Sequence, residues 1–299
     1  MAETMYSVTA KYSMHDPISG KELNILFVKK KASTGEKNGV SYLNGQIKFQ
    51  GVSLNVYSYL TDGVLIDTGA QSLHTFFQPF MDEGDFDQVM ITHFHEDHTG
   101  CAAYAEKTKK LPIFLNEKSI ISCAKRADYP LYRQLFWGRR KPFNAQAMPD
   151  SFSSRKAQWD VIDTPGHAFD HKALLNRETG QLFTGDLFVS EKTKVVLAEE
   201  SIPEIIRSLE RVLTYDFEDV FCSHAGYVED GRAALQRKRD YLLSIEDDVF
   251  ALHKEGNSAD AIRQKLFPKK YPIVKFSGGE WDSRHIVTSI LEESSTRTL

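Results

Sequence analysis

The chain has few cysteines, no long apolar run and no excess of positive charge. Its three cysteines are too few, and odd in number, for a disulfide framework. No apolar run approaches the roughly 20 residues that span a bilayer. The first six residues, MAETMY, lack the basic and apolar regions of a signal peptide. These absences predict a cytoplasmic protein without a membrane partner.

The charge balance narrows the choice of partners. Lysine and arginine number 37 against 41 for aspartate and glutamate, which gives a net charge of −4. This balance does not indicate a general nucleic-acid binder, although a local basic patch is compatible with it. A small-molecule substrate is therefore the expected partner, nucleic acid stays open, and a homodimer is compatible with the sequence.

Residues 93–98, with the sequence HFHEDH, are the most informative part of the chain. They place three imidazoles and an aspartate within six residues, directly after the apolar run 89–91. Short apolar runs of this kind are typical of buried strands, so these side chains would leave a rigid strand end. Imidazole and carboxylate donors suit Zn²⁺ and also admit iron, manganese or nickel. The pattern therefore predicts a metal site.

Three further segments repeat the same order of strand, turn and polar donor. Each follows an apolar or aromatic run, and the loops at strand ends commonly carry the chemistry of a fold. Four such strand ends at one edge of a sheet assembly can converge on one cleft. The three segments are 164–167 (TPGH), 184–186 (TGD) and 223–226 (SHAG).

Taken together, these motifs resemble the metallo-β-lactamase superfamily of metal-dependent hydrolases, over about residues 51–226. The resemblance implies a dinuclear site in which one ion is held by His93, His95 and His167, the other by Asp97, His98 and His224, and both by a bridging Asp186. The segment 65–69 (LIDTG) resembles the family's early strand–turn motif. In that motif the aspartate, here Asp67, orients a metal ligand.

The bridging aspartate also indicates a branch and a reaction. Its presence resembles the glyoxalase II, lactonase, tRNA-processing nuclease and phosphodiesterase branches more than the antibiotic-cleaving β-lactamases. The resemblance implies two divalent ions, Zn²⁺ first and Mn²⁺ or Fe²⁺ as alternatives, with a bridging hydroxide that attacks a polarised carbonyl or phosphoryl group. Asp97 would orient the hydroxide and transfer its proton. We expect hydrolysis of a small ester-type substrate, a thioester or a lactone.

Two other activities remain open at this stage. A phosphodiesterase or RNA nuclease would use the aromatic and basic segment 129–143 to bind a single strand. A mononuclear iron sulfur dioxygenase would use a subset of the same donors. His171 is expected to support a ligand or to face the substrate, and Tyr227 to hydrogen-bond a substrate oxygen.

Strands and helices alternate along the chain, which predicts an α/β fold. The resemblance makes this an αββα sandwich with the metals at one edge of two packed sheets. Residues 1–38 show little periodicity, and strands are expected from Val40 onward. Residues 1–230 would form the catalytic domain, with 119–155 as a lid over the site. Residues 231–299 would form a helical C-terminal extension packed on this core.

Overall fold

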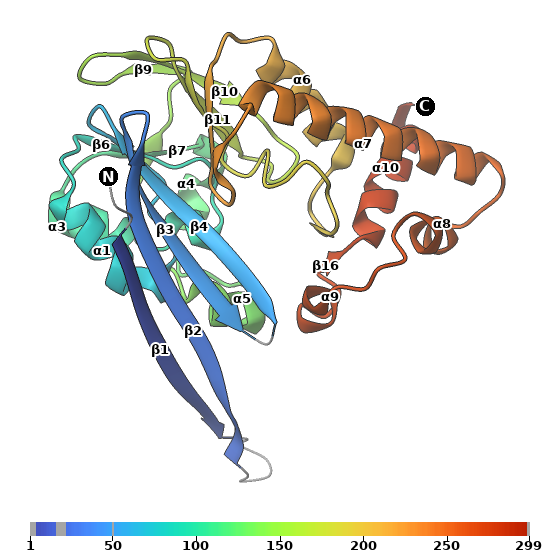
Figure 1. Ribbon diagram of the computed structural model, residues 1–299, viewed down its shortest axis with the longest axis horizontal. Coiled ribbons are helices and arrows are strands. Elements are labelled where there is room, and N and C mark those ends of the chain that lie inside the picture. The colour runs from blue at the N-terminus through green and yellow to red at the C-terminus, as the bar shows by residue number, and fades with distance from the viewer. Residues whose placement is uncertain (1–3, 16–21, 50, 298–299) are drawn as a thin grey trace. The chain divides into compact units, whose positions relative to one another are not determined.

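The computed structural model describes residues 4–15, 22–49 and 51–297 (Figure 1). Within these residues the fold is mixed α/β, as predicted. No helix in the described part of the chain is both long and apolar enough to cross a membrane. The chain divides into two compact units. The first comprises residues 1–91, 95–115 and 120–146, and the second comprises 92–94, 116–119 and 147–299.

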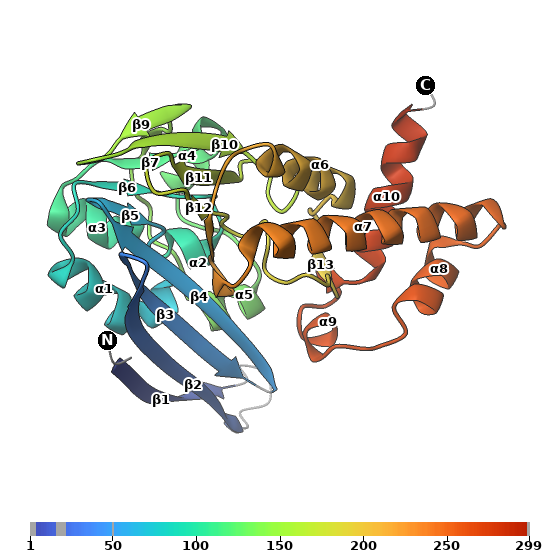
Figure 2. The same ribbon diagram turned by 45° about the horizontal axis from the view of Figure 1, so that its top comes forward.

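The first sheet has eight strands that follow one another in chain order. Strands β1 to β4 form a long antiparallel ribbon, which Figure 2 shows most clearly, and β5, β6 and β7 run parallel to one another. The strands are β1 (Thr4–His15), β2 (Glu22–Lys37), β3 (Val40–Phe49), β4 (Val52–Thr61), β5 (Val64–Ile66), β6 (Gln88–Met90), β7 (Ile113–Leu115) and β8 (Gln146–Ala147).

The β1–β2 hairpin differs from the sequence expectation, which placed strands only from Val40 onward. Its backbone pairs continuously from Thr4–Thr34 to Tyr12–Leu26, and β2 then pairs with β3. A strand is recognised from sequence by the alternation that one buried face imposes. Residues 6–14 do carry this alternation, with apolar or aromatic residues at the even positions and polar residues at the odd ones, so the sequence contains a strand signal for β1.

Helices of the first unit connect and cover these strands. In β3 the residues that alternate toward the interior include Leu43, Ile47 and Phe49, which are buried. The helices are η1 (Gln71–Leu73), α1 (His74–Glu83), α2 (Glu96–Thr99), α3 (Ala102–Lys109), α4 (Glu117–Cys123) and α5 (Leu131–Trp137).

The second unit is built on a six-stranded sheet in the order β15-β14-β12-β11-β10-β9. Its β12–β14 pair is parallel, and the other pairs between these described strands are antiparallel. A separate pair is formed by β13 and β16. The strands are β9 (Ser151–Ser153), β10 (Gln158–Asp163), β11 (Lys172–Asn176), β12 (Gln181–Phe183), β13 (Val196–Leu197), β14 (Asp219–Cys222), β15 (Gly226–Val228) and β16 (Trp281–Asp282).

The long helices of the second unit lie mainly in its C-terminal part. Their bounds are α6 (Ile202–Leu213), α7 (Gly231–Lys254), α8 (Ala259–Leu266), α9 (Pro272–Phe276) and α10 (Arg284–Arg297). Both ribbon views show α6 and α7 side by side (Figures 1 and 2). Buried residues of α6, α7, α8 and α10 form one apolar cluster with Leu182 and Val220 of the sheet. The predicted C-terminal helices are therefore present and share the core of the second unit.

Two parallel strand pairs determine the sheet edges at which the segments with the candidate ligands emerge. Ile66 of β5 pairs with Met90 of β6, and Phe183 of β12 pairs with Phe221 of β14. In a parallel pair both chains run in one direction, so the segments that follow leave at the same edge. Asp67 and the HFHEDH motif therefore emerge together, and so do residues 184–186 and 223–226.

Helix α7 approaches the second sheet too closely for any side chain at its first residue. A Cβ at Gly231 would lie 2.4 Å from Cγ2 and 2.5 Å from Cβ of Val220. We expect Gly231→Ala to lower the free energy of unfolding by about 1–3 kcal/mol, because the helix start must move off β14. Urea denaturation measures this loss. Ser244→Ala, an exposed change in the same helix, should be neutral or slightly stabilising.

Candidate metal centre

Three overlapping groups of side chains could each hold a metal ion. Within each group, the ligand atoms lie within 4.8 Å of one another. The groups are His93, His95 and His167; His93, His98 and Asp186; and Asp97, His98 and His224. Together they contain all seven residues that the sequence motifs single out as ligands.

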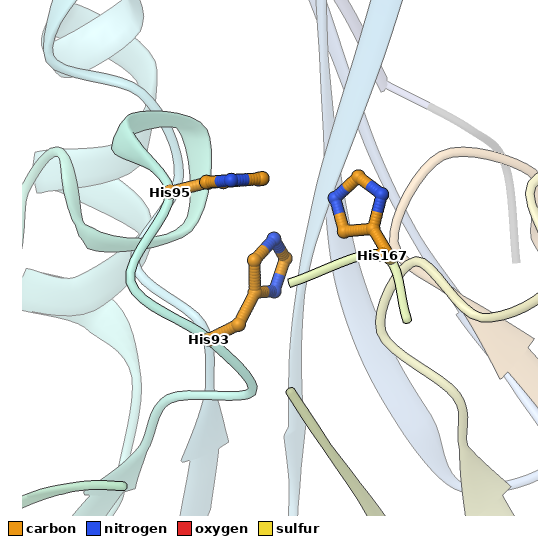
Figure 3. A group of neighbouring side chains, drawn as sticks. All are labelled: His93, His95 and His167. Atoms are coloured by element: carbon orange, nitrogen blue, oxygen red, sulfur yellow. The ribbon is translucent and has the colours of Figure 1, made fainter. Parts of the chain in front are cut away.

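Figure 3 shows the imidazoles of His93, His95 and His167 turned toward a common space. All seven side chains of the three groups are buried except His224, which is 20% exposed. Buried carboxylates and imidazoles are costly unless they pair or coordinate a cation. Five imidazoles and two carboxylates are also the donor types that Zn²⁺ and its neighbours accept. The residues present therefore fit a divalent metal ion.

Outer partners fix the orientation of three of these imidazoles. Nδ1 of His98 lies 2.7 Å from Oδ2 of Asp67, the aspartate of the early strand–turn motif. Nδ1 of His167 lies 3.2 Å from Oε2 of Glu200. Nδ1 of His93 lies 3.1 Å from the hydroxyl oxygen of Thr92. A partner at Nδ1 directs Nε2 toward a metal, which is the usual arrangement around ligating histidines.

The carboxylate of Asp186 lies between two of the histidines. Its Oδ2 is 2.8 Å from Nε2 of His224 and 3.3 Å from Nε2 of His167. The backbone N–H of Asp186 donates to Nε2 of His171 at 2.9 Å. The other nitrogen of His171 hydrogen-bonds the hydroxyl of Thr164 at 2.7 Å. With both nitrogens engaged, His171 supports the turn that carries Asp186.

The remaining sequence candidates lie as follows. The hydroxyl of Tyr227 donates to Asp219 at 2.9 Å, so its contact with a substrate stays a prediction. Asp97 is buried, with Oδ2 3.7 Å from Nε2 of His98. Burial raises the pKa of the Cys101 thiol to about 12 and also raises that of Cys222, so neither is poised as a thiolate nucleophile.

An ion pair that the sequence motifs do not reveal ties helix α5 to the HFHEDH segment. Arg133 of α5 donates from Nε and Nη2 to the two carboxylate oxygens of Glu96, at 2.6 and 2.7 Å. The C-terminal end of α5 is held separately, because Ser72 donates to the carbonyl of Phe136 at 2.5 Å. No short sequence motif indicates this ion pair, because Arg133 and Glu96 lie 37 residues apart. A lid role for residues 119–155 stays a prediction.

Known proteins resemble this chain in sequence over large parts of its length. A model of the metallo-beta-lactamase superfamily matches residues 54–224. A probable metallo-hydrolase of Bacillus subtilis is 23% identical over 255 residues, which are 71% of this chain and 77% of that protein. A beta-lactamase-like protein 2 homolog of Drosophila melanogaster is 30% identical over 243 residues, or 78% and 80% of the two chains. A thioesterase of Emericella nidulans is 30% identical over 151 residues, which are 49% of this chain and 38% of that protein.

A solved structure supports the fold assignment. The crystal structure of a metallo-beta-lactamase family protein from Thermus thermophilus has a TM-score of 0.64 and 20% sequence identity. The match covers 87% of this chain and 95% of that one. The metallo-β-lactamase fold predicted from the sequence is therefore confirmed.

The Arg133–Glu96 pair generates a stability prediction. Replacing Arg133 with methionine leaves the buried Glu96 carboxylate without its cation, which costs about 3–5 kcal/mol of unfolding free energy. Adding Glu96→Gln should recover part of that loss. Arg139→Met is the matched control, because Arg139 is exposed and bonds the side chain of Gln134. Equal unfolding curves for Arg133→Met and Arg139→Met would contradict the prediction.

Proposed function

The chain belongs to the metallo-β-lactamase superfamily of hydrolases, and we propose that it uses two divalent metal ions to cleave a small ester-type substrate, first of all a thioester. A lactone is the second member of the same class. The overlap of the three ligand groups is the observation that carries the proposal. His93 is common to the first and second groups and His98 to the second and third, while Asp186 lies in the middle group.

This overlap favours two neighbouring ions over one. A set built for a single ion needs three or four protein ligands, whereas seven donors are gathered here. Asp186 is suited to bridge, because one of its carboxylate oxygens approaches the nitrogens of both His167 and His224. Divalent ions held by these residues would supply Lewis acidity that polarises a carbonyl oxygen and activates water at neutral pH, and Zn²⁺ is the first choice.

Asp97 would carry out the proton transfers of the reaction. Its buried carboxylate stands beside His98 and carries the acceptor oxygens that a general base requires. It would take a proton from the attacking water and pass it to the leaving group. A thiol leaving group, with a pKa of about 8.5, departs with little help, so one carboxylate is sufficient for a thioester. The similarity to a thioesterase over about half of this chain supports the same substrate class.

The nuclease alternative draws less support from the segment that suggested it. Of its basic side chains, Arg133 is paired with Glu96, and Arg140 is buried and donates to the carbonyls of Cys123 and Ser122. Guanidinium groups used in this way hold the protein together and are poorly placed to neutralise phosphates. A nucleic-acid partner and a homodimer both stay predictions.

Substitution of the ligands should separate metal binding from turnover. His93→Ala and Asp186→Ala are expected to lose metal and activity together, because each removes a donor from the overlapping groups. Asp97→Asn should keep part of the metal through its amide oxygen but lose turnover by about 10²–10⁴-fold. Elemental analysis and kcat measure the two effects. His253→Ala, in an exposed part of α7, is the control. Full activity of Asp186→Ala would contradict the bridging role.

A substrate panel tests the proposed class. Metal-loaded protein should hydrolyse thioesters faster than lactones and simple esters, and chelation of the metal should abolish the activity. Thiol release can be followed with a chromogenic thiol reagent. Labelled single-stranded RNA belongs in the same panel. Cleavage of RNA that disappears in His98→Ala, with no thioester hydrolysis, would replace the proposal by the nuclease alternative.

A further inference from the structure

Helix α7 has one charged residue on its buried face. The buried positions recur every three or four residues, as expected for a helix packed on a core. They are Gly231, Ala234, Leu235, Lys238, Leu242, Ile245 and Val249. Lys238 is only 5% exposed, whereas its neighbours Arg237 and Arg239 bond to Glu191 and Asp240 near the surface. An apolar residue would be the ordinary choice at position 238.

The ammonium group of Lys238 contacts the turn that carries Asp186. Nζ donates to the carbonyl of Leu187 at 2.8 Å and to that of Phe188 at 2.6 Å. These are the two residues that directly follow Asp186. Burial lowers the pKa of Lys238 to about 8, while the charges of Glu200 and Asp186 raise it. An ammonium is costly to bury, so its position calls for a specific benefit.

The turn after Asp186 has a conformation that needs outside support. Val189 has φ +48°, a left-handed conformation that is unfavourable for a β-branched residue. Such strain persists where surrounding contacts hold the backbone in place. The N–H of Val189 donates to Sγ of Cys222 at 3.3 Å, and that of Asp186 donates to His171. Lys238 holds the same turn through its carbonyl groups, those of Leu187 and Phe188.

We propose that Lys238 is a positioning residue for the metal centre. By holding the carbonyls of Leu187 and Phe188, it fixes the turn that sets the Asp186 carboxylate against His167 and His224. Residues of the C-terminal extension thus take part in forming the centre. The inference rests on the metal-binding role proposed for Asp186.

Metal affinity tests the proposal independently of activity. Lys238→Met keeps an unbranched apolar stem as far as Cε but removes the ammonium group, with its charge and its donors. We expect its affinity for Zn²⁺, measured by competition with a chromophoric chelator, to fall about 10–100-fold, the range found for partners that support ligands. The visible absorption of the Co²⁺-loaded variant should shift, because the geometry of Asp186 changes.

Two matched variants separate positioning from general destabilisation. Arg237→Met, one residue away and exposed, should bind Zn²⁺ as the wild type does. Val249→Ala creates a cavity on the same buried face, eleven residues from Lys238 and so about 16 Å farther along the helix. It should lower the Tm but leave the Zn²⁺ affinity unchanged. If Val249→Ala weakened Zn²⁺ binding as strongly as Lys238→Met, the proposal would be overturned.

A graded variant keeps the test decisive if Lys238→Met does not fold. Lys238→Gln retains one amide donor without charge, so its Zn²⁺ affinity should lie below that of the wild type and above that of Lys238→Met. Wild-type affinity in Lys238→Gln would overturn the proposal. Failure of the wild-type protein to bind Zn²⁺ or Co²⁺ would instead overturn the proposed function, so the two failures are distinguishable.

Discussion

The concentration of ionisable side chains inside the protein is the constraint on which the rest of the structure depends. Five histidines and two aspartates form the three ligand groups, and nearly all of them are buried. Two further buried carboxylates, Asp67 and Glu200, stand behind them. Such a cluster is favourable only where each group has a partner and where cations offset the negative charge. The rest of the chain supplies those partners.

The partners come from segments that are distant in sequence from the ligands they serve. Asp67 orients His98 across 31 residues, and Glu200 meets His167 from the segment that precedes α6. Arg133 holds the Glu96 carboxylate in the middle of the HFHEDH segment, and Lys238 holds the turn after Asp186. Helices α5 and α7, which lie outside the ligand motifs, therefore contribute to the order of the metal-binding loops.

Strand direction decides where the ligands can be placed. The pairs β5–β6 and β12–β14 are parallel, so each brings two following segments to one sheet edge. Short strands of three or four residues are sufficient, because their apolar side chains are fully buried and hold the strand ends firmly. Flexible loops could not keep several nitrogens and oxygens within 4.8 Å of one another.

The sequence by itself determined the family, the fold class, the seven candidate ligands and the expectation that Asp67 orients one of them. These features are local, because motif residues, strand periodicity and turn residues lie next to one another in the chain. Only the tertiary structure decided the roles of Glu200, Arg133 and Lys238 and the use of both nitrogens of His171. A single charged residue has no periodicity, and its meaning depends on which distant backbone or side chain it meets after folding.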